Sequence, residues 1–243
     1  MLTPIDYAKR IAYSSEETLM FTYEQAKKYA DKDGVYVECG VAAGAQIIAM
    51  AYGAPNKTIY AFDSFEGIPL PSNRDDQMPG IMMLTEAEQK ALPDPGKQKL
   101  ESSGATVVSL EDFIKNIDSS LGVVSVYEAG VRTFIKTKNQ NDLDVGTKVD
   151  SGVILAYKGW FENRLPGFLD PISILRLDGD LYNSTYVCLK NLYPKVIEGG
   201  LIIIDDWELK GCRDAFYDYF NNQLNPYESP FIKYVSNIAY FYK

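Results

Sequence analysis

The stretch VYVECGVAAGAQIIAMAY, residues 35–52, decides how this chain is expected to fold. It begins with a short apolar run at residues 35–39, typical of a buried strand, and ends with a helical pattern over residues 45–52. Between them, Gly40 and Gly44 remove two side chains from a tight turn, so a ligand can approach the backbone there. The sequence therefore predicts a strand, a glycine turn and a helix whose N-terminus points at a binding site.

The next predicted strand, residues 58–62, supplies an acidic residue to the same site. It leads into Asp63, and the spacing from Gly44 to Asp63 is 19 residues. A carboxylate about 20 residues beyond such a turn accepts hydrogen bonds from ribose hydroxyls. The spacing favours a site for a ribose-bearing cofactor. In the alternative interpretation, the glycines only permit a tight turn and Asp63 is a solvated strand end.

Glu38 distinguishes between two classes of cofactor. It stands at the first glycine position of the G-x-G-x-x-G pattern, in which exposed amides receive a pyrophosphate. A carboxylate there would repel a pyrophosphate, but it tolerates a cofactor with a cationic amino group and no phosphate. Glu38 therefore favours S-adenosylmethionine over NAD.

Strands and helices alternate along the second half of the chain. Strand composition appears at residues 153–157, 172–177 and 201–204, and helical patterns at residues 185–193 and 213–220. This alternation predicts an α/β protein with a doubly wound, mostly parallel sheet. Two strand-like segments end the chain and fit an antiparallel pair at a sheet edge.

Three segments lie outside this alternation, and we expect residues 1–243 to form a single domain that contains them. Residues 1–33 carry apolar groups at helical spacing and predict N-terminal helices. Residues 64–104 are rich in proline, glycine and charge, which indicates a lid, a binding loop or a disordered segment, with residues 73–76 as a solvated turn. Residues 123–151 alternate around a glycine and predict a hairpin-like insert.

Acidic residues follow two predicted strands that are neighbours in the sequence. Asp178 and Asp180 come after one strand, and Asp205 and Asp206 come after the next. Because the carboxyl ends of parallel strands meet at one sheet edge, we expect the four side chains to gather beside Gly40. Carboxylates ~4–6 Å apart repel by several kcal/mol at an effective dielectric near 20.

A bound cation would relieve this repulsion. Oxygen ligands without histidine or cysteine suit Mg²⁺, Mn²⁺ or Ca²⁺ rather than Zn²⁺. Two alternatives need no cation. Arg176 could neutralise part of the cluster, and Asp205 and Asp206 could cap the helix that follows them.

Composition excludes several other kinds of site. The chain has no histidine, so histidine-dependent catalysis and histidine-ligated metals are excluded. The net charge of -9 argues against nucleic-acid binding. Cys39, Cys188 and Cys212 form no CxxC pair, which indicates a reducing compartment. No apolar run is long enough for a membrane span, so we expect a cytoplasmic protein without a membrane or nucleic-acid partner.

Five motifs together resemble the macrocin O-methyltransferase family of magnesium-dependent sugar O-methyltransferases. They are VECGVAAG, AFDSFEGIP, KGWFENRLP, LRLDGDLYNST and IEGGLIIIDDW, and the match runs in order over residues 34–220. The resemblance implies a single class I methyltransferase domain, Rossmann-like, with a seven-stranded sheet and an antiparallel last strand. It also implies S-adenosylmethionine as donor, Mg²⁺ or Mn²⁺ as cofactor, and a hydroxyl of a glycosylated small molecule as acceptor. It makes a homo-oligomer plausible.

The resemblance also implies roles for individual residues. The divalent ion would be held by Asp178, Asp205 and Asp206, and Asp180 would be the general base. The residues implied at the donor site are Glu38, Gly40, Gly44, Asp63, Ser64, Gly159 and Trp160. The insert at residues 123–151 and the short, tyrosine-rich C-terminus depart from the family pattern, so the resemblance leaves the acceptor open.

Two rival functions come from other classes. A D-x-D sequence after an apolar strand also describes phosphotransferases of the haloacid dehalogenase type. Only 27 residues separate Asp178 from Asp205, which leaves room for one helix where that fold has several strands. The second rival is a domain that binds the nucleoside without catalysis, although the four retained carboxylates argue against it.

Overall fold

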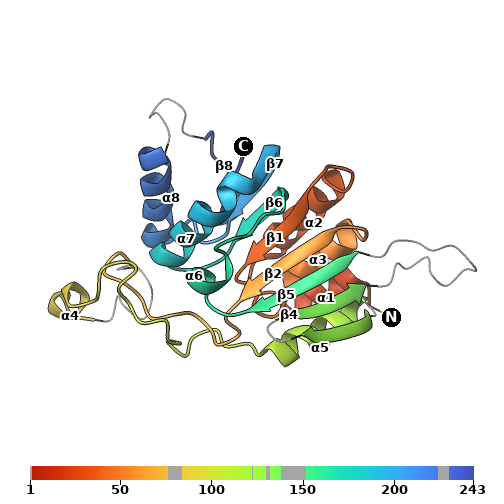
Figure 1. The fold of residues 1–243 in the computed structure, drawn as a ribbon, viewed down its shortest axis with the longest axis horizontal. Coiled ribbons are helices and arrows are strands. Elements are labelled where there is room, and N and C mark those ends of the chain that lie inside the picture. The colour runs from red at the N-terminus through yellow and green to blue at the C-terminus, as the bar shows by residue number, and fades with distance from the viewer. Residues whose placement is uncertain (1, 76–83, 122, 130–131, 138–151, 224–229) are drawn as a thin grey trace, which may run out of the picture.

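The computed structural model describes residues 2–75, 84–121, 123–129, 132–137, 152–223 and 230–243. A nine-stranded sheet in the order β3-β4-β5-β2-β1-β6-β7-β9-β8 forms its centre (Figure 1). The strands are β1 (Val35–Cys39), β2 (Thr58–Asp63), β3 (Val123–Ala129), β4 (Arg132–Thr137), β5 (Val153–Lys158), β6 (Ile172–Leu177), β7 (Val196–Ile204), β8 (Lys233–Val235) and β9 (Ile238–Tyr242). The helices are α1 (Pro4–Ile11), α2 (Glu16–Lys28), α3 (Ala45–Gly53), α4 (Glu86–Lys90), α5 (Leu110–Leu121), α6 (Phe161–Arg164), α7 (Tyr182–Leu192), the 3₁₀ turn η1 (Tyr193–Lys195) and α8 (Lys210–Gln223).

The five central strands, β5, β2, β1, β6 and β7, are parallel, and their carboxyl ends lie level with one another. Cys39 pairs with Leu177, and Leu177 pairs with Ile204. The hydrogen bonds continue one residue further, because Asp178 N donates to Cys39 O and Asp205 N donates to Leu177 O. This register brings the residues that follow β1, β6 and β7 out side by side at one sheet edge.

The sheet has two strands more than the seven expected from the family resemblance. At one edge, β9 lies antiparallel between β7 and β8, in agreement with the expected reversed last strand. At the other edge, β3 and β4 form an antiparallel pair, and β4 is antiparallel to β5. The seven expected strands run from β5 to β8 in the sheet order, and β3 and β4 add two more at the free edge of β5, where backbone groups are available for pairing.

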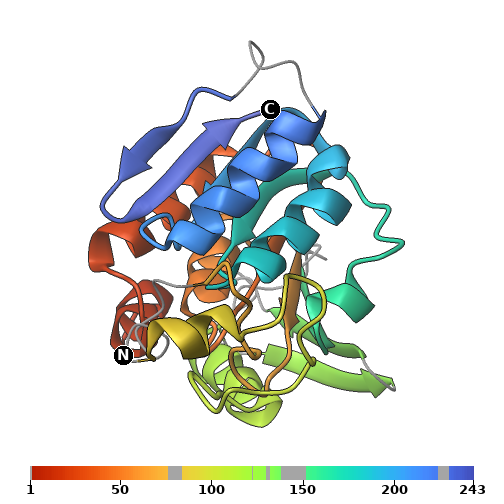
Figure 2. The ribbon, with the colours of Figure 1, turned by 90° about the vertical axis from the view of Figure 1, so that its left-hand side faces the viewer.

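Helices cover both faces of the sheet and enclose two hydrophobic cores. On one face, α1, α2, α3 and α5 form a core that contains residues such as Ile47, Ile48 and Phe113. On the other face, α7 and α8 lie side by side across the sheet and bury residues such as Leu189 and Phe216 (Figure 2). β6 is buried along its whole length, as expected for the centre of a doubly wound sheet.

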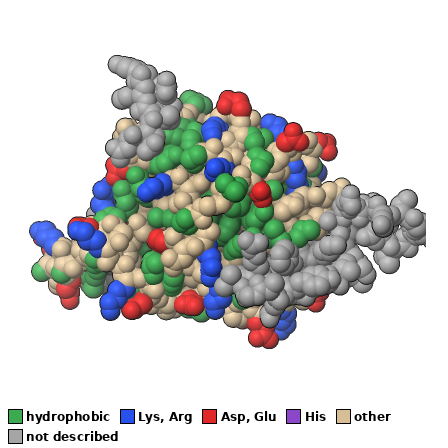
Figure 3. Space-filling view, in the orientation of Figure 1, with side chains coloured by type: hydrophobic (Ala, Val, Ile, Leu, Met, Phe, Trp, Pro, Cys, Tyr) green, Lys and Arg blue, Asp and Glu red, His purple; other side chains and the backbone are tan. Residues whose placement is uncertain are grey.

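All three cysteines are free thiols in the interior, and burial raises the pKa of Cys188 and of Cys212. On the outside, acidic and basic side chains are interspersed on the face drawn in Figure 3. Among the helices of the described ranges, none combines the length and the apolar character needed to cross a membrane.

Candidate active site

A cavity of about 330 Å³ opens at the carboxyl edge of the central strands, and its size suits a small organic ligand. The turn after β1, the ends of β2, β6 and β7, and the N-terminal segment all contribute to its walls. The residues predicted from the sequence that line it are Glu38, Gly40, Asp63, Ser64, Trp160, Asp178, Asp180, Asp205 and Asp206. The sheet edge therefore brings the expected donor residues and the expected acidic residues into one space.

Gly40 marks the closest approach between two strand ends. It has φ of +85°, and a Cβ at this position would lie 1.7 Å from the carbonyl oxygen of Asp178. That distance is far below any van der Waals contact, and the obstacle is backbone. A glycine is therefore required for β1 and β6 to end side by side.

Asp63 has a structural role that the spacing argument did not predict. Its Oδ2 accepts hydrogen bonds from the amides of Val41, at 2.8 Å, and Ala42, at 3.0 Å. Its Oδ1 accepts from the amide of Phe65 at 2.7 Å. The carboxylate therefore braces the glycine turn from the end of β2 while it lines the cavity.

Two of the predicted donor residues, Gly44 and Gly159, are not among the residues that line the cavity. Gly44 precedes α3 with φ of +89°, and a Cβ there would lie 2.9 Å from the ring of Phe113. Gly159 has φ of +138°, and a Cβ there would lie 2.5 Å from the side chain of Arg164. Both glycines shape the chain next to the cavity, and Trp160 follows Gly159 into the lining.

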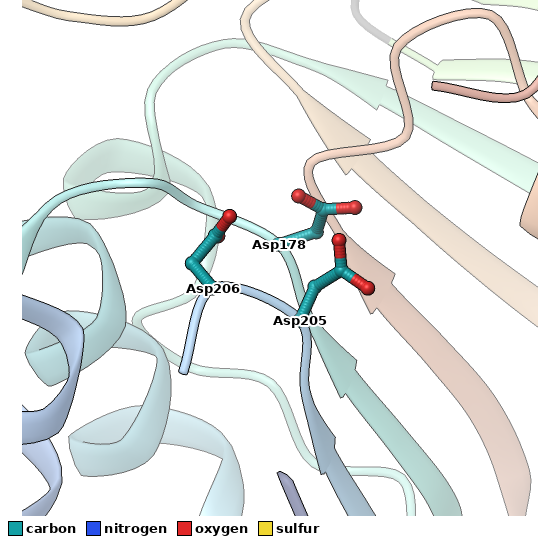
Figure 4. Close-up of side chains that lie close together, drawn as sticks. All are labelled: Asp178, Asp205 and Asp206. Carbon is teal, nitrogen blue, oxygen red and sulfur yellow. The ribbon is translucent and has the colours of Figure 1, made fainter. Parts of the chain in front are cut away.

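The carboxylates of Asp178, Asp205 and Asp206 converge where β6 and β7 end (Figure 4). Each offers one oxygen, and these three oxygens lie within 4.8 Å of one another. Such a group of carboxylate oxygens, beside a cavity, fits the ligand preference of Mg²⁺ or Mn²⁺. The geometry of the chain's own residues thus suits the cation that the sequence suggested.

Arg176 partly neutralises this cluster. This agrees with one of the two alternatives that need no cation. Its side chain is fully buried, and Nη1 donates to Asp178 Oδ2 at 2.7 Å and to Glu38 Oε1 at 2.9 Å. Its Nη2 donates to Asp205 Oδ1. The other alternative is not seen among the described residues, where Asp205 Oδ1 accepts from Arg176 and Asp206 Oδ2 accepts from the amide of Asp180.

One guanidinium does not balance the negative charge of the site. Among the described residues that line the cavity there is no lysine or arginine. Burial, with the neighbouring Asp178 and Asp205, raises the pKa of Asp180 to about 7. Burial also raises the pKa of Glu38 to about 8 and that of Asp206 well above its usual range, in spite of Arg176 beside Glu38. Burial contributes most to these raised pKa values and the neighbouring acids add to it, and a bound cation would lower them.

Asp180 lies in a strained turn and not on a strand. β6 ends at Leu177, so Asp178 and Asp180 both follow the strand. Asp180 has φ of +60°, and the amide of Leu181 donates across it to Gly179 O at 2.6 Å. This is the pattern of a γ-turn with positive φ, which is rare and costs ~1–3 kcal/mol for a residue with a side chain. The turn directs the Asp180 side chain into the cavity lining.

The N-terminal segment contributes residues that the sequence analysis did not predict for the site. Tyr13 and Ser14, between α1 and α2, line the cavity together with Gln46 of α3. Gln46 Nε2 donates to Ser14 Oγ at 2.8 Å, and Gln46 Oε1 is buried without a hydrogen-bond partner. No motif marks these positions, because they reach the site only through the packing of α1 and α2 on the sheet.

Comparisons with known proteins agree with this geometry. The macrocin O-methyltransferase (TylF) family model matches residues 144–243, which include both acidic strand ends. The resemblance to the macrocin O-methyltransferases is confirmed. Over 62 residues the chain is 50% identical to the 8-demethyl-8-(2,3-dimethoxy-alpha-L-rhamnosyl)-tetracenomycin-C 4'-O-methyltransferase of Streptomyces olivaceus, which covers 25% of this chain and 24% of that protein.

A second relative matches a longer part of the chain. The demethyldecarbamoylnovobiocin O-methyltransferase of Streptomyces niveus is 28% identical over 193 residues, 76% of this chain and 58% of its own. The chain thus spans less than two thirds of the length of either relative. The solved structure of the O-methyltransferase NovP superposes with a TM-score of 0.61 at 23% identity, covering 94% of this chain and 80% of that one. The class I methyltransferase fold expected from the resemblance is therefore confirmed.

Proposed function

We propose that this chain is an S-adenosylmethionine-dependent O-methyltransferase that acts, with a divalent cation, on a sugar hydroxyl of a glycosylated small molecule. The observation that carries the proposal is the convergence of Asp178, Asp205 and Asp206 within 4.8 Å, in the same cavity as the glycine turn. The named relatives, which methylate a rhamnosylated tetracenomycin and a novobiocin precursor, support the reaction class and the kind of acceptor.

The donor side of the cavity suits a cationic cofactor. Glu38 Oε2 is buried without a hydrogen-bond partner, and Glu38 is 1% exposed. A positively charged amino or sulfonium group nearby would compensate this carboxylate, whereas a pyrophosphate would be repelled. We assign the donor to the space bounded by Glu38, Gly40, Asp63, Ser64 and Trp160.

The acidic side of the cavity suits activation of a hydroxyl. Asp178, Asp205 and Asp206 would hold the divalent ion, which when bound lowers the pKa of the acceptor hydroxyl and orients it. Asp180 is the base: its carboxylate accepts the hydroxyl proton while the oxygen forms a bond to the donor methyl carbon. The carbon–sulfur bond breaks at the same time, and sulfur keeps the electron pair. Positioning of the two reactants supplies much of the rate, since the displacement is in line.

Thermal-shift measurements, followed by a transfer assay, test the proposal. S-adenosylhomocysteine and Mg²⁺ should each raise the Tm, because ligands that bind only the folded state stabilise it. Radiolabelled methyl should then pass from S-adenosylmethionine to a rhamnosylated acceptor. An Asp206→Asn variant should lose the response to Mg²⁺ while it keeps the response to S-adenosylhomocysteine.

Three results would contradict the proposal in different ways. Stabilisation by NAD alone would overturn the cofactor assignment. Release of phosphate from an aryl phosphate, without a methyl donor, would favour the phosphotransferase alternative. Tight donor binding with no transfer to any glycoside in the presence of Mg²⁺ would indicate a binding domain without catalysis.

A further inference from the structure

Asp75 is a buried acid outside the cavity, in the part of the chain that the sequence analysis assigned to a solvated turn. That assignment was wrong for this residue, which is 2% exposed, next to a fully buried Ser72. Asp75 Oδ2 accepts from the amide and the hydroxyl of Ser72, at 2.8 and 2.7 Å. Its Oδ1 accepts from the amide of Tyr182 at 2.7 Å.

The bond to Tyr182 caps α7 from a distant part of the sequence. Tyr182 is the first residue of α7, and Leu181 before it offers no side-chain hydrogen bond to the helix. The first amides of a helix need acceptors from outside the helix, and a negative charge is favoured at this end. Asp75 provides both for α7.

This cap fixes the downstream side of the strained turn at Asp180. The upstream side is already held, because Asp206 Oδ2 accepts from the amide of Asp180 at 2.9 Å. Backbone strain of this kind persists only where the surroundings over-determine the conformation. We propose that Asp75 is a positioning residue: by holding the start of α7, it keeps the Asp180 turn in the conformation that presents its carboxylate to the acceptor. The proposal rests on the proposed function only in the role given to Asp180.

Gly211, at the start of α8, lies close to both Asp75 and the first residue of α7. A Cβ at Gly211 would lie 2.6 Å from Asp75 Oδ1 and 3.2 Å from the amide nitrogen of Tyr182. A methyl group there would overlap with the carboxylate oxygen that accepts from Tyr182. Gly211→Ala therefore perturbs the same hydrogen bond without removing Asp75.

The test compares Asp75→Ala and Gly211→Ala with the control Asp94→Ala. Asp94 is an exposed acid that lies later in the same segment and accepts from Lys97 and Asn73. In Asp75→Ala we expect kcat for methyl transfer to fall about 10- to 100-fold, as for a reacting group displaced by about 1 Å. The Kd for S-adenosylhomocysteine should stay unchanged. Hydrogen exchange should increase in the peptide that contains residues 178–186, which reports on the turn without any need for activity.

Gly211→Ala should show the same pattern in milder form, and Asp94→Ala should match the unsubstituted protein. A loss of donor affinity in proportion to kcat would overturn the proposal, because it would indicate general damage. Increased exchange with unchanged kcat would overturn it as well. If Asp75→Ala does not fold, Gly211→Ala decides by the same criteria. If the unsubstituted protein transfers no methyl group, the proposed function fails, and the exchange measurement still decides whether Asp75 holds the turn.

Discussion

At the scale of single residues, one buried guanidinium forms ion pairs with three carboxylates at three strand ends. Arg176 contacts Glu38 on the donor side of the cavity, and Asp178 and Asp205 on the acidic side. Burial of these charges costs free energy. The attraction between Arg176 and the carboxylates offsets that cost only while all of the partners are present. The same side chain therefore links the geometry of the two halves of the site.

Replacement of Arg176 by Met should lower the free energy of unfolding by about 3–5 kcal/mol, because it leaves buried carboxylates without a partner. Urea denaturation measures this. Arg213→Met is the matched control, since Arg213 donates to the carbonyl groups of Trp207 and Glu208 and its loss should cost about 1 kcal/mol. Equal losses in the two variants would show that the triple contact of Arg176 contributes nothing of its own.

The two acids after β6 should respond differently to substitution by Asn. Asp180→Asn should lower kcat by about 10²- to 10⁴-fold, the usual contribution of a general base, while the Tm response to Mg²⁺ is retained. Asp178→Asn should weaken that Mg²⁺ response. Kinetics and thermal shift on both variants check this, and full turnover by Asp180→Asn would rule out Asp180 as the base.

At the scale of the elements, the sheet edge depends on one crowded junction and not on glycine flexibility in general. Gly40 and Gly104 have nearly the same φ, +85° and +82°. Their surroundings differ, because a Cβ at Gly40 would meet the backbone of Asp178, whereas a Cβ at Gly104 would meet nothing within 4 Å. A comparison of substitutions at Gly40 and Gly104 therefore distinguishes the cost of backbone strain from the cost of steric overlap.

Gly104→Ala should cost about 1 kcal/mol for the positive φ alone. Gly40→Ala should be far more destabilising, since β1 and β6 would have to separate, and we expect little folded protein. The Tm and the soluble yield of the two variants measure the difference. Similar stabilities would mean that the ends of β1 and β6 are not in the close contact described above.

At the scale of the whole molecule, the acidic site should set the pH dependence of stability. Burial raises the pKa of Asp180 and of Asp205 to about 7, from an ordinary value of 3.8. Between these pH values the folded protein binds protons that the unfolded chain has released, so the free energy of unfolding falls as the pH rises from about 4 to 7.

Without divalent ions, the Tm should fall by at least about 3 °C between pH 5 and pH 8. Mg²⁺ should raise the Tm more at pH 8 than at pH 5, because carboxylate ligands must be deprotonated to bind it. Calorimetry over this range, with and without Mg²⁺, checks both statements. A Tm that rises steadily towards pH 8 in the absence of Mg²⁺ would contradict the first.

What could be predicted from the sequence depended on short-range patterns. The strand, turn and helix around Gly40 follow from adjacent residues, and the order of the strands placed Asp178 and Asp205 together. The turn at Asp180 was not predictable from local sequence. It is defined by one hydrogen bond within the turn and by two hydrogen bonds to the distant residues Asp206 and Asp75. Asp75 was missed for the same reason: its partner Tyr182 lies more than a hundred residues away. The alternating pattern of residues 123–151 predicts a hairpin but does not specify which edge of the sheet the hairpin joins. The two additional strands of the sheet were therefore not predicted.

The burial of every cysteine has a practical consequence for spectroscopy. Cys39, Cys188 and Cys212 are at most 1% exposed. Maleimide reagents should therefore leave the native protein unlabelled, and a cysteine introduced at Leu169, which is 77% exposed, would carry a fluorophore at one defined place. A dye there, paired with a fluorescent donor analogue in the cavity, would report ligand residence times without any substitution of the native thiols.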